Sequence, residues 1–150
     1  MSGREVEAYL HAHIPLSAAM GVRVREASPE RVVLTAPLEP NLNHQSTAFG
    51  GSVAALAILA GWTLIHLRLD AAGVPSRTVV QKSHVDFRAH VDGPFEAVAE
   101  APDAAAWKRF LKTLERRGRA RVRVRVGVTE EGSERAVLEA AYVSFAGVPE

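Results

Sequence analysis

Residues 50–69 read GGSVAALAILAGWTLIHLRL, and this stretch decides the fold of the chain. From Val53 to Leu67 nearly every position is apolar, and only Thr63 and His66 interrupt the run. A helix that is hydrophobic on all of its faces must be surrounded by other structure rather than packed on one side. At ~1.5 Å per residue such a helix is roughly 30 Å long, about the width of a small domain. We therefore expect one central helix that the rest of the chain encloses.

The same segment must also be tested as a membrane span, because no charged residue occurs from Ala48 to Ile65. We interpret it as a core helix, since it contains glycines, Ser52 and Thr63 and is dominated by small alanines. The N-terminus lacks the apolar core of a secretory signal, and the chain has no cysteine, which fits a reducing compartment. We therefore expect a cytoplasmic protein with no membrane partner.

Segments of alternating polarity, bounded by turn residues, surround the central helix. The predicted strands cover residues 21–26, 31–36, 77–91, 95–101, 120–128 and 136–145, and two further helices cover residues 5–13 and 103–117. Runs of strands around one enclosed helix indicate the α+β class with an antiparallel sheet. The length suits a single domain over residues 1–150. An antiparallel sheet wrapped around a long central helix is the hotdog fold.

The longest predicted strand, residues 77–91, has two different faces. Its odd positions are mostly apolar, whereas its even positions from Lys82 onward are charged or histidine. Because side chains of a strand point alternately to opposite sides, the odd positions are expected to face the core. Gln81 and Ser83 are therefore predicted to be polar exceptions on an apolar face.

Positive charge is concentrated in residues 108–125, which contain nine of the 18 lysines and arginines and only one acidic residue, Glu115. In the strand that begins at Arg119, arginines alternate with valines, so the arginines are expected to share one exposed face. Such a face can bind coenzyme A phosphates or the acidic surface of a partner subunit. The segment has no interleaved aromatic residues and no docking motif, so we expect no specific nucleic-acid partner.

Four blocks of the sequence resemble one family, the thioesterase domain of the YiiD C-terminal type in the hotdog superfamily. They are HAHIPLSAAMGV, NLNHQSTAFGGSVAALAILAGW, VVQKSHVDFRAHVDGPFEA and FLKTLERRGRARVRVRV. The resemblance implies a homodimer, or a tetramer of two dimers, in which long strands pair edge to edge. It also implies an acyl thioester bound between the subunits, with coenzyme A or a carrier protein as part of the substrate and no other cofactor.

Thioester hydrolysis requires a group that polarises the carbonyl, and the start of the central helix is suited to this. Gly50 and Gly51 open the helix, where unpaired backbone amides and the positive end of the helix dipole can stabilise an oxyanion. The adjoining Thr47 and Phe49 are predicted to bind substrate with them. The alternative is that the two glycines only permit close packing and that Thr47 caps the helix.

The residue that activates water is less evident. Many hotdog thioesterases have a histidine before the glycine pair and a carboxylate on the helix, but Phe49 and Ile58 occupy those positions here. No acidic residue occurs between Glu39 and Asp70, so the central helix has no carboxylate before its end. The base must therefore come from the preceding loop or from a neighbouring subunit.

Three polar residues are candidates for the missing chemistry. His44 is the only histidine of the loop and is a candidate general base, and Asn43 is a candidate for orienting water or holding the carbonyl. Ser83 is the third candidate, acting on the partner's helix terminus. Each also has a structural alternative, namely turn formation for the loop residues and a local hydrogen bond for the serine.

Two arginines, Arg88 and Arg119, are predicted to bind the substrate, and Arg119 does so as part of the arginine face that suits coenzyme A phosphates. The six histidines lack the spacing and the acidic neighbours of a metal site, so no metal is expected. Two alternatives to hydrolysis stay open: a non-catalytic module that binds acyl-CoA, and a hotdog dehydratase or hydratase. The second is disfavoured because those enzymes use the missing helix carboxylate.

Overall fold

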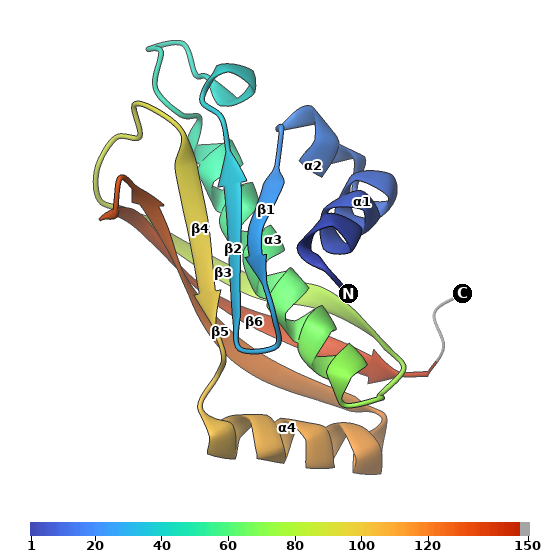
Figure 1. The fold of residues 1–150 in the computed structure, drawn as a ribbon. Helices are drawn as coiled ribbons and strands as arrows, with labels where there is room; N and C mark the ends of the chain where they lie inside the picture. The colour runs from blue at the N-terminus through green and yellow to red at the C-terminus, as the bar shows by residue number, and fades with distance from the viewer. Residues whose placement is uncertain (148–150) are drawn as a thin grey trace.

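A long helix, α3 (Gly50–Ala71), lies against the concave side of a curved antiparallel sheet in the computed structural model, which describes residues 1–147 (Figure 1). The six strands have the order β1-β2-β4-β5-β6-β3. They are β1 (Arg23–Ala27), β2 (Arg31–Ala36), β3 (Ser76–Phe87), β4 (Phe95–Glu100), β5 (Arg119–Glu130) and β6 (Ser133–Ala146). The predicted α+β arrangement of an antiparallel sheet around a long central helix is confirmed.

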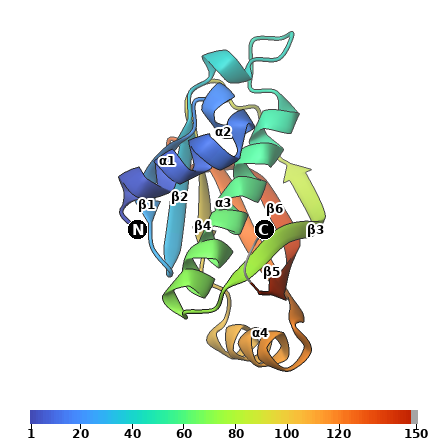
Figure 2. The same cartoon turned by 90° about the vertical axis from the view of Figure 1, so that its right-hand side faces the viewer.

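Three shorter α-helices and a 3-10 helix, η1 (Glu39–Asn41), lie outside this central unit among residues 1–147. α1 (Gly3–His13) and α2 (Pro15–Ala19) cover α3 on the side away from the sheet, and α4 (Ala104–Arg117) lies at the opposite end of the molecule from α2 (Figures 1 and 2). Asp103 caps α4 and Gly118 ends it in the left-handed conformation, so the helix lies within the predicted range of residues 103–117.

The central helix is enclosed by the sheet, as its all-round hydrophobicity requires. Leu56, Ala60, Leu64 and Ile65 are completely buried. α3 is long and apolar enough to cross a membrane, yet 61% of its most apolar stretch is buried inside the protein. This burial is that of a core helix.

One close contact fixes how β6 lies against α3. The Tyr142 hydroxyl donates a hydrogen bond of 2.6 Å to the carbonyl of Ile58. It reaches the helix backbone because position 61 is glycine: a Cβ atom there would lie 2.3 Å from the Tyr142 hydroxyl oxygen. Burial raises the pKa of Tyr142 well above its ordinary value, although the backbone of Trp62 opposes this in part. The tyrosine is therefore a neutral, buried donor.

The predicted alternation of β3 is wrong in the first half of the strand. A bulge lies between Val80 and Lys82, and one extra residue in a strand exchanges the two faces beyond it. Before the bulge Thr78 faces the helix and bonds the Ser144 hydroxyl at 2.7 Å, whereas Val79 is 52% exposed on the outer side.

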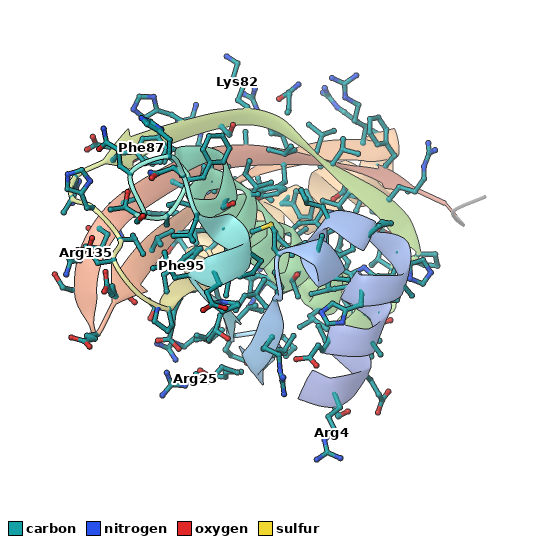
Figure 3. The ribbon with its side chains drawn as sticks, turned by 90° about the horizontal axis from the view of Figure 1, so that it is seen from above. Arg4, Arg25, Lys82, Phe87, Phe95 and Arg135 are labelled. Atoms are coloured by element: carbon teal, nitrogen blue, oxygen red, sulfur yellow. The ribbon has the colours of Figure 1, made fainter. Side chains whose placement is uncertain are left out.

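Beyond the bulge, the odd positions of β3 face the helix as predicted. Ser83, Val85 and Phe87 pair with residues of β6 that also face the helix. The strand ends at Phe87 rather than at residue 91, because the next two amides both donate to the Arg135 carbonyl and leave the regular ladder. Figure 3 shows Phe87 at this end of β3.

Replacing Gly61 with alanine tests the contact between α3 and β6. We expect Gly61→Ala to destabilise the protein by about 1–3 kcal/mol, because the methyl group collides with Tyr142. Helix propensity alone would stabilise the same variant by about 1 kcal/mol. Urea unfolding of Gly61→Ala, Tyr142→Phe and the double variant measures the coupling. An equal effect of Gly61→Ala in both backgrounds would contradict the proposed contact.

Candidate active site

The loop that leads into α3 is held by backbone hydrogen bonds at both of its ends. The Phe49 amide donates to the Asn41 carbonyl at 2.7 Å, and the Ala48 amide donates to the Val91 carbonyl at 2.9 Å. Asn41 is itself buried and donates to the carbonyls of Met20 and Pro37. The start of α3 is thus anchored to α2 and to the segment that follows β3.

The side chain of Asn43 organises the inside of this loop. Its Nδ2 donates to the Thr47 hydroxyl at 2.7 Å and to the Ala48 carbonyl at 3.3 Å. Its Oδ1 accepts from the amides of Gln45 and Thr47 at 2.8 and 3.2 Å. Because these four bonds use both ends of the amide, Asn43 shapes the loop in this structure, and its predicted contact with water or a thioester is not visible here.

The first amides of α3 are available to a ligand. Among residues 1–147, no protein group accepts a hydrogen bond from the amides of Gly50 and Gly51. The next two amides, of Ser52 and Val53, both donate to the Phe49 carbonyl. The N-cap residue, Phe49, has no side-chain acceptor to offer them. Two unpaired donors at the positive end of a 22-residue helix favour an anion or a developing oxyanion.

A hollow of about 360 Å³ adjoins this helix start. Four residues predicted from the sequence line it: Asn43, Thr47, Gly50 and Arg88. Further lining residues come from Val53 of α3 and from the chain around the end of β3, including Phe87, His90 and Val91. The structure therefore brings four of the nine predicted site residues together at one place.

Two aromatic rings border the helix start, and both are 56% exposed. The Phe49 ring lies over Gly51, where a Cβ atom would come within 2.3 Å of it. The Phe87 ring lies beside Gly50, where a Cβ atom would be 3.5 Å from it, an ordinary van der Waals contact. Gly51 thus permits the Phe49 ring to lie against the start of the helix, whereas the position of the Phe87 ring does not require a glycine at position 50.

His90 is a candidate that the strand pattern places wrongly. Strict alternation predicts it on the outer face of the sheet, with a role in solvation or subunit contact. Because β3 ends at Phe87, His90 belongs to the connecting segment and lines the hollow beside Gly50. His44 is exposed in the neighbouring loop and does not line that hollow. The sequence gives no sign that β3 ends at Phe87, because the nearest turn signal, Gly93-Pro94, lies several residues beyond that end.

Other predicted site residues lie elsewhere or have other partners. Ser83 is exposed in the middle of β3, on the side that faces the helix. Arg88 forms ion pairs with Asp86 at 3.2 Å and Glu134 at 2.7 Å. Arg119 pairs with Phe145 at the end of the sheet near the C-terminus of α3, so the length of the helix separates it from Gly50.

A second hollow, about 300 Å³ in volume, lies between α2, α3 and β3 and is almost entirely apolar. Ile58, in the position that a carboxylate occupies in many hotdog thioesterases, lines it together with Ala55 and Trp62. Trp62 is held in place because its indole N–H donates to the Thr78 carbonyl at 2.7 Å. The other lining residues include Ile14, Leu16, Met20, Leu59 and Val80. This hollow suits a hydrocarbon chain.

Residues 3–146 match the family described as "Putative thioesterase (yiiD_Cterm)". The chain belongs to this family. A protein of unknown function from Chlorobaculum tepidum TLS is 27% identical, with a TM-score of 0.89 over 97% of this chain and 94% of that one. The putative thioesterase from Shewanella oneidensis is 26% identical, with a TM-score of 0.84 over 98% and 97% of the two chains.

A probable thioesterase from Pseudomonas aeruginosa is 23% identical, with a TM-score of 0.85 over 98% of this chain and 97% of that chain, and it supports the fold. The predicted family is confirmed, and the fold is the hotdog fold of thioesterases.

Beside the apolar hollow of this thioesterase-family chain, four rings form a continuous stack that joins α1 to α3. His13 stacks on Tyr9 with 4.1 Å between ring centres, Tyr9 on His66 at 5.2 Å, and His66 on Trp62 at 4.9 Å. Burial lowers the pKa of His66, and the nearby carboxylate of Asp70 opposes this. The neutral form of His66 is therefore the one that the stack favours.

The lowered pKa of His66 predicts a loss of stability in mild acid. Below the ordinary pKa of 6.5 the unfolded chain binds a proton at this position more readily than the folded chain does. The free energy of unfolding therefore decreases as the pH is lowered. We expect His66→Phe, which keeps a ring in the stack, to flatten this dependence. Urea unfolding between about pH 7 and about pH 5 measures it. Equal slopes for the two proteins would contradict the prediction.

Proposed function

We propose that this protein hydrolyses an acyl thioester whose carbonyl binds at the start of α3. The observation that supports this most directly is the pair of unpaired amides of Gly50 and Gly51 beside the 360 Å³ hollow. The chain belongs to a thioesterase family, and for this reason we propose an acyl thioester as the substrate that binds there. Coenzyme A or a carrier protein is part of the substrate, no other cofactor takes part, and the reaction takes place in the cytoplasm.

In this proposal the two amides donate to the thioester oxygen as it becomes an oxyanion. A water molecule adds to the carbonyl carbon and loses its proton to a base, and the tetrahedral intermediate then expels the thiolate. The thiolate takes up the proton, so the products are a carboxylic acid and a thiol. Removing one donor from a preorganised oxyanion site typically costs about 10²–10³ in rate, so two such donors make a large contribution.

Two histidines supply candidates for the base. His90 lines the hollow beside Gly50. His44 is exposed in the adjoining loop. In this proposal His44 reaches the water either by a small movement of the loop or by acting on the site of a second subunit. Asn43 positions Thr47 and the loop in this proposal and adjusts the approach of the water. In this proposal the Ser83 hydroxyl of each subunit's β3 acts at the start of the other subunit's α3. These roles replace the missing carboxylate of α3.

The apolar hollow between α2 and α3 receives the acyl chain in this proposal. Its lining contains Ile58 instead of a charged residue, and an uncompensated carboxylate there would be costly to bury beside a hydrocarbon. The same substitution supports the second candidate function, a module that binds acyl-CoA without hydrolysing it. Tight binding of acyl-CoA with no turnover would favour that function.

Alanine substitution of the histidines tests the proposed hydrolysis. We expect purified protein to hydrolyse at least one member of a panel of acyl-CoAs, and loss of the base to lower kcat by about 10²–10⁴. The variants are His44→Ala and His90→Ala, with His13→Ala, an exposed histidine of α1, as the matched control. Full activity in both His44→Ala and His90→Ala would exclude these two histidines as the base. Absence of turnover with every acyl-CoA and with acyl carrier proteins would remove the proposed reaction.

We also propose that two copies pair through β3. This strand of 12 residues forms one edge of the sheet, so its outer hydrogen-bonding groups have no partner strand among residues 1–147. Long edges that stay unprotected are sites of strand pairing. Val79, Val80 and Phe87 on this edge strand are exposed, which supports a covering partner. Arg119 reaches the start of an α3 helix only from such a partner, whereas Arg88 lies next to Gly50 in the same chain.

Lysine substitution on the edge tests this pairing. Edge lysines oppose strand addition, so we expect the double variant Val79→Lys/Val80→Lys to be monomeric where the wild type has twice the chain mass. Light scattering after size-exclusion chromatography measures both masses. Ala105→Lys, on the exposed side of α4, is the control. A monomeric wild type, or an unchanged mass in the double variant, would contradict pairing through β3.

A further inference from the structure

The outer face of the sheet, opposite to α3, carries a row of arginines. Arg119, Arg121, Arg123 and Arg125 of β5 are exposed on this face, whereas the residues between them are buried against the core. The row continues sideways across the sheet: Arg123 lies opposite Ala141 of β6, and Ala141 lies opposite Lys82 of β3. Figure 3 shows Lys82 pointing away from the helix.

Ala141 produces a depression in the middle of this face. Neighbouring strands are about 4.8 Å apart, so the backbones at Arg123 and Lys82 lie roughly 10 Å apart with only a methyl group between them. The result is a hollow of about 720 Å³, within the usual range for small-molecule sites. Its walls include Lys82, His84, Arg121, Arg123, Arg125 and Glu139.

The positive charge around the hollow is poorly compensated. Arg123 and Lys82 form no ion pair within residues 1–147, and Arg121 has only a hydrogen bond of 3.4 Å to the Gln81 side chain. Arg125 lies 3.4 Å from the Glu134 carboxylate, which also pairs with Arg88 at 2.7 Å. The carboxylates along the other side of the arginine row already pair with Arg25 and Arg31. Four permanent cations therefore face one carboxylate, Glu139, in the hollow.

We propose that this outer hollow, centred on Ala141, binds the phosphate groups of a small nucleotide-type ligand. Guanidinium groups bind phosphate oxygens through two parallel hydrogen bonds, and Arg121 and Arg123 are about 7 Å apart along the strand, close enough to share a diphosphate. A small ligand fits the depression, whereas the acidic surface of a protein would need a broader, flatter face. The bulge at Gln81 places a neutral amide, rather than another charge, beside Arg121.

The phosphates have two chemical sources, the nucleotide end of coenzyme A and a free nucleotide. Lys82 lies five residues before Phe87, roughly 17 Å along the strand, and Phe87 borders the site at Gly50. A flexible pantetheine arm can cover such a distance around the end of the strand, so one acyl-CoA can occupy both places; this source rests on the proposed thioester hydrolysis. A free nucleotide in the hollow would instead act on the enzyme from outside its active site.

Calorimetric titration with adenosine 3′,5′-bisphosphate, coenzyme A and inorganic phosphate tests the site. We expect the bisphosphate to bind the wild type and binding to weaken at least tenfold in Arg123→Ala and Lys82→Ala. Arg123→Lys should restore only part of the affinity, because it retains the charge and loses the guanidinium geometry. Arg4→Ala removes an equal charge from exposed α1, on the opposite side of the molecule from Lys82 (Figure 3), and should leave the affinity unchanged.

Absence of bisphosphate binding, or equal weakening in Arg4→Ala, would overturn the proposal. Preference for a DNA or RNA duplex over the bisphosphate would also overturn it. The two sources are separated by hydrolysis of acyl-CoA and of an acyl-pantetheine, which has no nucleotide. If the nucleotide of the substrate occupies the hollow, Arg123→Ala raises KM for acyl-CoA alone. If a free nucleotide occupies it, KM for both substrates is unchanged and the bisphosphate does not compete with acyl-CoA.

Discussion

The structure depends on enclosing one helix that is apolar on every face. Burying α3 requires a sheet that curves around it, and the small residues along the helix let the sheet approach closely. At Gly61 the approach is so close that the Tyr142 hydroxyl reaches the helix backbone. α1 and α2 complete the enclosure on the other side through apolar contacts and the ring stack.

The same enclosure determines where chemistry can occur. A helix surrounded along its length is accessible mainly at its ends, and the N-terminal end has unpaired amides as well as the positive pole of the dipole. The loop before it and the segment after β3 are tied together by the bond between Ala48 and Val91, so their side chains surround that end. Polar chemistry is thus separated from the apolar hollow that borders Ile58.

The two faces of the sheet have different roles because of the alternation in β5. Its valines face α3 and contribute to the core, and its arginines can face only the outside. An almost neutral chain therefore has one strongly basic surface. Like charges on this surface oppose the stacking of two such sheets face to face without an anion between them.

The sequence by itself determined the elements whose signal is local and strong. The uniformly apolar run predicted α3, strict alternation predicted the two faces of β5, and the helix predicted over residues 103–117 corresponds to α4. The two glycines also marked the start of α3, because helix ends follow from local sequence.

Only the tertiary structure decided the bulge in β3, the end of that strand at Phe87 and the position of His90. Val79 and Val80 are both apolar, so alternation cannot show which of them faces the helix; pairing with β6 settles it. The hollow over Ala141 likewise arises because β3, which is distant in sequence, pairs with β6 of the β5–β6 hairpin. Such features depend on which strands become neighbours, which is decided by packing around the helix rather than by local sequence.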